Sequence, residues 1–282
     1  MVTKETFATL ELKEFQFDPR SDYSLLYHGS HGRNKIEKAH KHDFYLLFLI
    51  EKGSGIHSID FIDYSVTDFQ IHILFPDQVH KWDLGEETSG YQLMISKRVF
   101  ETFSTSMQFS FLLYQRHPVI KLSQPLFHNL LFEFENLKRE LALHPVYWDI
   151  VYSRSKLITQ LVNREIHSKF DDITVYQTNP TLMRYHSLID NHYKEEKTVA
   201  FYANKLNISA NYLNILCKNN LKVTALYLIQ TRTTLEAKRL LQSSQKTIKE
   251  ITFELGFNDI PYFSNFFKGQ TGVSPRQFRE QL

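Results

Sequence analysis

Cysteine is scarce in this sequence, and so are the long apolar runs that would place the chain in a membrane. Cys217 is the one cysteine among 282 residues, so an internal disulfide is excluded and the reducing cytosol is the expected compartment. No apolar run approaches the roughly 20 residues that a membrane-spanning helix needs. The first residues, MVTKETFATLELKEF, lack the apolar core of a secretory signal peptide. These absences predict a soluble, cytoplasmic protein with no membrane partner.

The net charge of the whole chain is small, but it is unevenly distributed. The chain carries 33 Lys and Arg, 31 Asp and Glu, and a net charge of +2. Residues 181–282 hold 14 of the basic and 8 of the acidic side chains, a net charge of +6, which leaves −4 for the rest of the chain. A basic C-terminal third fits a module that binds phosphate groups. A length of 282 residues also favours two domains over one.

The stretch TIKEITFELGFNDIPYFSNFFKGQTGVSPRQF, residues 247–278, has the strongest local signals. Thr247 and Glu250 form a capping box, in which each side chain accepts a hydrogen bond from the other residue's backbone amide. Gly256 ends the first helix because glycine adopts a positive φ at little cost. The apolar face of this helix consists of Ile248, Ile251 and Leu255.

A second helix follows after a tight turn. Asp259 is its predicted N-cap, and Pro261 is tolerated in the first turn, where backbone amides have no partner within the helix. Gly272 and Pro275 end the helix. Its buried face is expected to be wide and to consist of Tyr262, Phe263, Phe266 and Phe267. Two helices joined by a tight glycine turn form a helix-turn-helix motif, whose second helix enters the DNA major groove.

This stretch resembles the C-terminal signature of the AraC/XylS family of transcription regulators. The segment that carries the resemblance is GFNDIPYFSNFFKGQTGVSPRQFR, residues 256–279. The matching positions are Gly256, Phe257, Asp259, Tyr262, Phe263, Ser264, Phe267, Lys268, Gly272, Ser274, Pro275, Phe278 and Arg279. Most of these residues build the core of the motif, which presents the few exposed residues to DNA.

Another helix-turn-helix motif is predicted earlier in the same region. Thr198 caps its first helix, Asn207 and Ile208 make the turn, and Ser209 caps the second helix. The residues expected to point inward are Val199, Ala203 and Leu206 on the first helix and Tyr212, Leu213 and Leu216 on the second. A long helix from Ala225 to Leu241 separates the two motifs. Its anchors are Leu228, Leu235 and Leu240, and its segment EAKRLL also resembles the family.

The outward side of the first recognition helix is predicted to read bases. Asn211 and Asn214 can each make a bidentate contact with adenine, and Lys218 suits a phosphate. The alternative for each asparagine is a solvated surface position. The predicted contacts on this helix are Ser209, Ala210, Asn211, Asn214 and Lys218, with Ile215 nearer the edge. Cys217 stands where the family has Phe.

The second recognition helix is predicted to position the protein more than it discriminates sequence. Ile260 and Pro261 offer apolar contact to a thymine methyl group, and Ser264 and Lys268 suit phosphates. The predicted contacts on this helix are Ile260, Pro261, Ser264, Asn265 and Lys268. The two recognition helices start about fifty residues apart. Held by one long helix, they could enter successive major grooves roughly 34 Å apart.

The N-terminal part is predicted to be a β domain. A strongly apolar run from Phe44 to Glu51 precedes a turn at residues 53–55. Further strands are predicted at Ile56–Phe61, Val66–Leu74, His80–Leu84 and Gly90–Ile95, and a short helix at Arg98–Thr105. Short strands with regular turns suggest a sandwich or barrel. The family resemblance implies a cupin-like effector domain here, and HKHDFYLLFLIEKGSGIHSID and LFPDQVHKW resemble its opening half.

Two helices are predicted after the β domain. The first has Leu126, Leu130, Phe134 and Leu137 at helical spacing. The second runs from Tyr147 to Lys169, with Ile150, Leu157, Leu161 and Ile166 as apolar residues. The family resemblance implies a dimerisation hairpin, and a simple cover for the barrel is the alternative. The expected organisation is an effector domain at 1–122, the hairpin at 123–170, a linker at 171–180 and an all-α DNA-binding domain at 181–282.

Histidines in the β domain raise a choice between a sensor and an enzyme. His40 and His42 alternate onto one strand face, and His80 lies on a later strand. Metal-dependent cupins combine such histidines with a glutamate, but the apolar run around Leu46 and Leu47 occupies the expected position. Three histidines alone could still bind Zn²⁺, yet no metal or cofactor is predicted. The predicted effector-binding residues are His40, His42, Phe44, His80 and Trp82; His31, His57, His72 and Tyr45 are pocket or core residues.

Together these features predict a transcription regulator that binds promoter DNA and is not an enzyme. The family resemblance implies an activator that is a homodimer, contacts RNA polymerase and responds to a small effector bound in the β domain. A cupin-type metalloenzyme activity of the N-terminal domain is the rival interpretation.

Overall fold

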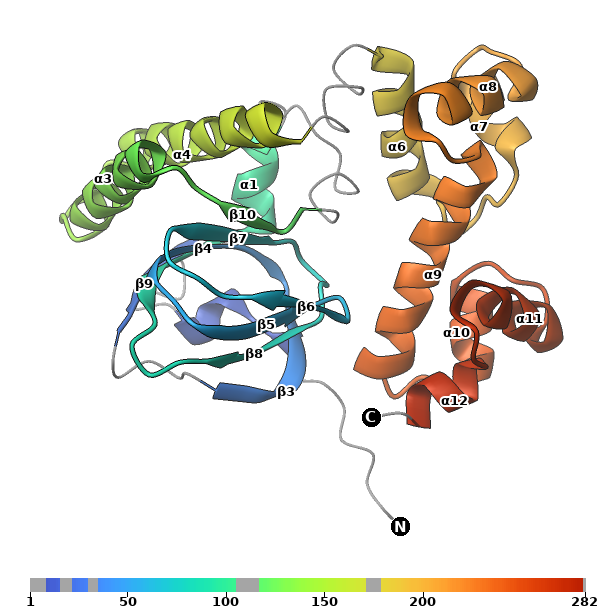
Figure 1. Ribbon diagram of the computed structural model, residues 1–282, viewed down its shortest axis with the longest axis horizontal. Helices are drawn as coiled ribbons and strands as arrows, with labels where there is room; N and C mark the ends of the chain where they lie inside the picture. The colour runs from blue at the N-terminus through green and yellow to red at the C-terminus, as the bar shows by residue number, and fades with distance from the viewer. Residues whose placement is uncertain (1–8, 16–21, 30–34, 105–116, 171–178, 281–282) are drawn as a thin grey trace. The chain divides into compact units, whose positions relative to one another are not determined.

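A computed structural model describes residues 9–15, 22–29, 35–104, 117–170 and 179–280 (Figure 1). Their contacts divide into two compact units, one formed by the described residues up to 170 and the other by residues 179–280. The predicted linker lies mostly outside the described residues. Its last two positions, Asn179 and Pro180, are the N-cap and first residue of a helix. No helix in the described ranges is long and apolar enough to cross a bilayer.

The first unit contains two five-stranded sheets. One sheet has the strand order β1-β3-β8-β5-β6, and the other has the order β10-β7-β4-β9-β2. The paired strands are antiparallel, except that β1 and β3 are parallel. The strands are β1 Thr9–Leu10, β2 Tyr23–His28, β3 Lys35–His42, β4 Phe44–Lys52, β5 Gly55–Ile59, β6 Ile62–Ser65, β7 Gln70–Leu74, β8 His80–Leu84, β9 Ser89–Ser96 and β10 Val119–Lys121.

Hydrophobic patterning explains where these strands lie. Strand β4 (FYLLFLIEK) is buried on both faces, because one face packs against the other sheet and the other is covered by helices. Strand β8 alternates buried and exposed residues, which is typical of a sheet with one face in water. The predicted β-rich N-terminal domain is confirmed.

The structure corrects several strand bounds. The predicted strand 56–61 ends at Ile59, because Asp60 and Phe61 adopt positive φ angles of 47° and 71° in a tight turn. The predicted strand 66–74 begins only at Gln70. The prediction missed β1, β2, β6, β10 and the first part of β3. Two of these, β3 and β6, carry many charged or polar residues, so the apolar signal of a strand was weak there.

Four helical segments complete the first unit: η1 Leu12–Phe15, α1 Lys97–Ser104, α3 Gln124–Leu141 and α4 Trp148–Lys169. Helices α3 and α4 form the predicted hairpin and lie over the sheet that contains β4 (Figure 1). Aromatic contacts join the sheet and the hairpin. The ring centres of Phe69 and Phe127 are 4.6 Å apart, and those of Tyr91 and Phe134 are 6.2 Å apart. The hairpin therefore covers the β domain with its inner face.

The inner face of α3 is the predicted one, since Leu126, Leu130, Phe134 and Leu137 are all buried. On α4 the predicted apolar set is partly wrong. Ile150 and Leu157 are 41% and 40% exposed, and the buried stripe is Val151, Ser155, Ile158, Val162 and Ile166. Small polar residues such as Ser155 fit this stripe because its hydroxyl donates to the Val151 carbonyl within the helix, at 2.8 Å.

The second unit is all helical. Its helices are α6 Pro180–His192, α7 Val199–Lys205, α8 Ala210–Leu221, α9 Ala225–Ser243, α10 Ile248–Glu254, α11 Ile260–Thr271 and α12 Pro275–Glu280. Helix α9 runs through the middle, with α7 and α8 beside one end and α10 and α11 beside the other (Figure 1). The long helix and both helix-turn-helix motifs are thus confirmed as elements.

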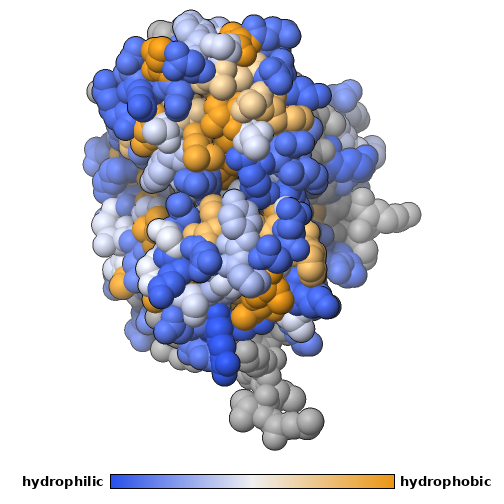
Figure 2. Space-filling model, turned by 90° about the vertical axis from the view of Figure 1, so that its right-hand side faces the viewer, coloured by the Kyte–Doolittle hydropathy of each residue, from blue (hydrophilic) through white to orange (hydrophobic). Residues whose placement is uncertain are grey.

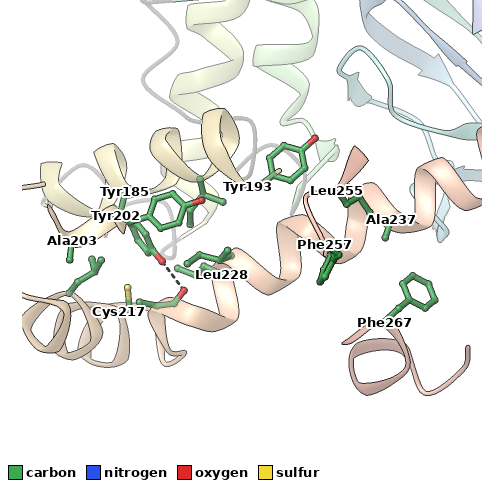
Figure 3. Close-up of a cluster of buried hydrophobic side chains, with 14 of the residues drawn as sticks. Tyr185, Tyr193, Tyr202, Ala203, Cys217, Leu228, Ala237, Leu255, Phe257 and Phe267 are labelled. Atoms are coloured by element: carbon green, nitrogen blue, oxygen red, sulfur yellow. Dashed lines mark hydrogen bonds between the residues drawn. The ribbon is translucent and has the colours of Figure 1, made fainter. Parts of the chain in front are cut away.

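One hydrophobic core holds the second unit together along α9 (Figure 3). The Tyr185 and Tyr202 rings lie near one end of α9, and the Tyr185 hydroxyl donates to the Ala225 carbonyl at 2.8 Å. Phe257 and Phe267 belong to the same core near the other end. Because the core is continuous, the two motifs are fixed relative to each other by packing against the same helix.

Candidate nucleic-acid interface

The first helix-turn-helix motif consists of α7 and α8. Its turn depends on Asn207, which adopts a positive φ of 56°, a conformation that asparagine tolerates better than most residues. Ser209 caps α8, as predicted, because its hydroxyl accepts a hydrogen bond from the Tyr212 amide at 3.1 Å. Thr198 occupies the N-cap position of α7, but its side chain makes no capping hydrogen bond. The predicted N-cap position is thus correct, but the predicted capping by the Thr198 side chain is wrong.

Helix α8 turns a buried stripe toward the core and a polar face toward solvent. The buried residues are Leu213, Leu216 and Cys217. The prediction placed Tyr212 in this stripe, but its side chain is 51% exposed. With Cys217 buried, the stripe is centred near Leu213, about 100° around the helix from Tyr212. Asn211 and Lys218 are exposed and Ala210 is half-buried.

Asn214 has a structural contact that its predicted role did not include. Its side chain is half-buried, and its Oδ1 accepts a hydrogen bond from the Ala225 amide at 3.0 Å. Ala225 is the first residue of α9, so this bond ties the recognition helix to the start of the long helix. A bidentate contact with adenine needs the same oxygen. The contact therefore favours a structural role for Asn214 over base reading.

The second motif, formed by α10 and α11, has the predicted caps. Thr247 and Glu250 make both bonds of the capping box. Gly256 adopts a φ of 72° at the turn. Asp259 caps α11 through its carboxylate, which accepts from the Tyr262 amide at 2.7 Å. Gly272 ends α11 with a φ of 82°.

The buried face of α11 is narrower than predicted. Phe263 and Phe267 are fully buried and Phe266 is partly buried against the core, but Tyr262 is 61% exposed. Tyrosine ends up outside because the adjacent Phe263 already fills the core position on this turn. The predicted contact residues lie on the solvent side: Ile260, Pro261, Asn265 and Lys268 are exposed and Ser264 is half-buried.

Buried ionic contacts fix α9 between the two motifs. The Arg232 guanidinium lies 3.3 Å from the Asp190 carboxylate and 3.0 Å from that of Glu236, and it stacks 3.9 Å from the centre of the Tyr193 ring. Burial would raise the pKa of Glu236, but the charges of Arg232 and Arg239 outweigh it, and the pKa is lowered. This network joins α6 to α9 away from the recognition helices.

The recognition helices combine apolar and polar exposure. Ile215 on α8 and Ile260 on α11 are 46% and 37% exposed, and the same two helices carry the exposed lysines Lys218 and Lys268. Figure 2 shows hydrophobic side chains scattered among hydrophilic ones on the surface in view. Such a mixture suits a DNA groove, where apolar side chains meet thymine methyl groups and cations meet phosphates.

Comparison with known proteins agrees with this geometry. A family model described as a helix-turn-helix domain matches residues 202–281. The HTH-type transcriptional activator RhaS of Citrobacter koseri is 23% identical over 268 residues, which cover 86% of this chain and 87% of that protein. RhaS of Escherichia coli O81 is 23% identical over 248 residues, with the same coverage.

Solved structures show similarity to the C-terminal part of the chain and to almost the whole chain. The C-terminal domain of AraT, a response regulator from Geobacillus stearothermophilus, is 31% identical, with a TM-score of 0.36, over 37% of this chain and 87% of that one. ToxT from Vibrio cholerae O395 is 12% identical, with a TM-score of 0.44, over 93% of this chain and 98% of that one.

The chain belongs to the AraC/XylS family. It is a DNA-binding transcription regulator, with an N-terminal β domain and a C-terminal double helix-turn-helix unit.

In this AraC/XylS regulator, the predicted effector residues gather inside the β domain. His40, His42, Phe44, His80 and Trp82 are all buried, with exposures between 1% and 7%. The His42 ring stacks on Phe44, with ring centres 4.3 Å apart, and lies 5.0 Å from the His80 ring. The prediction thus named residues that lie together. Of these five residues, Trp82 also lines a surface hollow of about 320 Å³, together with Ile36, Ile56, Lys81 and others.

Two further histidines belong to the same cluster. His57 on β5 and His72 on β7 are fully buried and join His80 in a chain of hydrogen bonds. The His57–His72 Nδ1 atoms are 2.8 Å apart, and His57 Nε2 lies 3.0 Å from His80 Nδ1. The sequence marked both only as pocket or core residues, because strands distant in the chain bring them together.

The direction of this chain follows from Gln70. Its Oε1 accepts from the Thr67 amide at 2.9 Å, so the same oxygen must accept from His72 Nε2, 3.1 Å away. If the rings are neutral, His72 then accepts at Nδ1 from His57 Nδ1, and His57 accepts at Nε2 from His80 Nδ1. The Nε2 of His80 is left as a buried acceptor, and no described residue donates to it.

His42, like His80, has a buried Nε2 that can only accept a hydrogen bond, and a separate contact is the cause. Its Nδ1 donates to the Phe44 carbonyl at 2.8 Å, which leaves its Nε2 as a buried acceptor without a donor among the described residues. Burial lowers the pKa of His42 and His72 to about 3, and it also lowers the pKa of His57 and His80. The cluster is therefore neutral at physiological pH. Among the described residues no group of three or more His, Cys, Asp or Glu is arranged to hold a metal ion.

Proposed function

We propose that this regulator activates transcription by binding promoter DNA with both helix-turn-helix motifs. Recognition helices α8 and α11 would enter successive major grooves, with Asn211 reading bases and Lys218, Ser264 and Lys268 contacting phosphates. The proposal gains support from the RhaS relatives, which are named as transcriptional activators. We also propose that the protein acts in the cytoplasm and contacts RNA polymerase.

The observation that carries this proposal is the position of two recognition helices on one continuous core. Helix α9 has 19 residues, so it is roughly 28 Å long at 1.5 Å per residue. Motifs packed at its two ends match the roughly 34 Å between successive major grooves on one face of DNA. The exposed predicted contacts are Asn211 and Lys218 on α8, and Ile260, Pro261, Asn265 and Lys268 on α11. Ala210 and Ser264 are half-buried, and Ser209 and Asn214 accept hydrogen bonds from backbone amides.

The β domain is proposed to bind a small effector at the buried histidine cluster. Two imidazole nitrogens, His42 Nε2 and His80 Nε2, have no donor among the described residues. They support this site because buried polar atoms normally have hydrogen-bond partners. Binding would act by shifting the population between arrangements of the protein that bind DNA differently, limited by the effector's difference in affinity for them.

The hairpin is proposed to hold two copies of the chain together. Its inner face covers the β domain, but Tyr147, the N-cap of α4, is 61% exposed, and Ile150 and Leu157 on α4 are 41% and 40% exposed. Exposed apolar side chains along one helix are typical of a packing surface for a second protein. Covering the sheet and joining two subunits are therefore compatible roles.

Replacement of Asn211 tests the proposed readout. Duplexes selected from random DNA by the purified protein would supply an operator, and random duplex would measure non-specific binding. Asn211→Ala is expected to weaken operator binding by roughly 1–3 kcal/mol, the value of one bidentate base contact, and to leave non-specific binding nearly unchanged. Asn219→Ala, at an exposed position near the end of α8, is the matched control. Equal losses on both duplexes would remove Asn211 from the readout.

The rival, a metalloenzyme activity of the β domain, has no specific observation in its favour. The position of the glutamate that a metal-dependent cupin would need is apolar, and the relatives are regulators. Measuring the metal content of the purified protein distinguishes the two, because a stoichiometric transition metal bound to the histidines would favour the enzyme.

A further inference from the structure

Tyr212 and Tyr262 occupy the same position in the two motifs. Each is the third residue after the N-cap of a recognition helix, and each donates its backbone amide to the capping side chain, at 3.1 Å from Ser209 and 2.7 Å from Asp259. Their side chains are 51% and 61% exposed. The two motifs thus repeat an exposed tyrosine where the patterning predicted a buried one.

Neither tyrosine is needed by the core. Leu213 and Phe263, the next residues along each helix, are fully buried and fill the core position. The Tyr262 ring rests against Phe257, with ring centres 5.7 Å apart, which orients it without burying it. Among the described residues neither tyrosine hydroxyl has a hydrogen-bond partner within the protein. An exposed aromatic ring with a free hydroxyl, held at a fixed position on a binding helix, is typical of a contact residue.

We infer that the Tyr212 and Tyr262 hydroxyls donate hydrogen bonds to DNA phosphates, one beside each recognition helix. Tyrosine is among the side chains that bind phosphate oxygens and set the register of a protein on the duplex without reading sequence. Each tyrosine directly follows a predicted groove residue, Asn211 or Pro261, in the sequence. Its side chain is therefore about 100° around the helix from that of the groove residue. A side chain placed there faces the wall of a groove entered by its neighbour.

The inference rests on the proposed entry of α8 and α11 into DNA. It adds a function to two residues that the predicted contact set left out. Because the contacts repeat in both motifs, they would hold both recognition helices at the same depth. The N-caps differ, since Ser209 is neutral and Asp259 is anionic. Repulsion between the Asp259 carboxylate and a phosphate makes the Tyr262 contact the weaker of the two.

Replacement by phenylalanine tests the inference, because it removes only the hydroxyl. In full-length protein, Tyr212→Phe and Tyr262→Phe should each weaken binding about 3- to 10-fold, the effect of losing one hydrogen bond to a charged group in a partly exposed site. The loss should be the same on the selected operator and on random duplex, because a phosphate is present in every sequence. The slope of affinity against salt should not change, since tyrosine carries no charge.

Tyr227→Phe is the matched control. Tyr227 is also the third residue after an N-cap, donates its amide to Thr224 Oγ1 at 3.1 Å and is 46% exposed, but it lies on α9 and not on a recognition helix. Its replacement should change affinity less than twofold. Thermal unfolding of all three variants should match that of the unchanged protein.

Three other outcomes would overturn the inference. Affinity within twofold on both duplexes would show that the hydroxyls contact nothing, and a loss on the operator alone would make the tyrosines base readers. An equal loss in Tyr227→Phe would mean that the effect is general to capped tyrosines. Failure of the unchanged protein to prefer any selected duplex would count against the proposed sequence reading, while the tyrosine effect would still be measured on random duplex at low salt.

Discussion

Three glycines in the second unit differ in their backbone φ angle and in the atoms around them. Replacing each by alanine therefore separates the effect of backbone strain from that of a steric clash. Gly256 has a φ of 72°, and a Cβ built on it would lie 1.9 Å from the Lys194 carbonyl oxygen. Gly272 has a φ of 82°, but its Cβ would meet no atom within 4 Å. Gly269 lies inside α11, with open space around it.

Alanine at these positions should give three different changes in the free energy of unfolding. Gly256→Ala is expected to lower it by about 3 kcal/mol, because strain and a clash with backbone add together. Gly272→Ala should lower it by about 1 kcal/mol from strain alone. Gly269→Ala should raise it by about 0.5–1 kcal/mol, because alanine favours a helix. Urea unfolding followed by circular dichroism measures all three, and equal effects at 256 and 272 would contradict the role assigned to Lys194.

At the scale of elements, the caps and turns were predictable and the exposed tyrosines were not. Capping residues act within three or four positions, so Thr247, Ser209 and Asp259 could be recognised from the chain alone. The exposure of Tyr212 depended on whether the buried stripe of α8 included Cys217 or the tyrosine, which only packing against α9 decides. The same limit applies to Asn214, whose contact with Ala225 joins residues on different helices.

The histidine chain in the β domain shows the same limit between strands. His57, His72 and His80 lie on β5, β7 and β8, and the contacts that join them depend on strand register. His40 and His42 could be grouped by alternation within one strand, whereas His57 and His72 could not. The histidine cluster in the structure is therefore larger than the predicted site. The direction of its hydrogen bonds could not be predicted from the sequence.

That direction predicts the tautomer of each ring. His42, His57 and His80 should carry their proton on Nδ1, and His72 on Nε2, because Gln70 and Phe44 supply the fixed acceptors. Ring ¹⁵N chemical shifts in the full-length protein at pH 7 distinguish the tautomers. Gln70→Leu removes the acceptor for His72 and should alter the shifts of the chain but leave those of His42. A proton on Nε2 of His57 would show that the chain runs the other way.

At the scale of the whole molecule, the two units differ in what acid does to them. The cluster of buried neutral histidines belongs to the first unit, and the second contains only His186 and His192. Acid should therefore destabilise the β domain first. The two units thus differ in their ionisable residues. The C-terminal third carries the excess of basic side chains, and the N-terminal part holds the buried histidines that respond to pH.

The sign follows from the lowered pKa values. His42 and His72 have a folded pKa of about 3, against 6.5 in the unfolded chain. Above pH 6.5 they are neutral in both states and do not affect stability. As the pH falls below 6.5, these histidines bind protons in the unfolded chain but not in the folded β domain. The free energy of unfolding of the β domain therefore decreases. At pH 5 each of the two should remove roughly 2 kcal/mol, and the loss should continue to about pH 3.

Tryptophan fluorescence can follow this transition without separating the units, because both tryptophans, Trp82 and Trp148, belong to the first unit. We expect their signal to change at a higher pH than most of the helical circular dichroism signal, because the second unit holds more helical residues than the first. His72→Gln keeps a hydrogen-bonding side chain but removes one buried imidazole, so it should shift the fluorescence midpoint to lower pH. His128→Gln, at an exposed position on α3, should leave the midpoint unchanged. Coincident fluorescence and helical transitions that neither variant moves would mean that the buried histidines do not control the acid stability of the β domain.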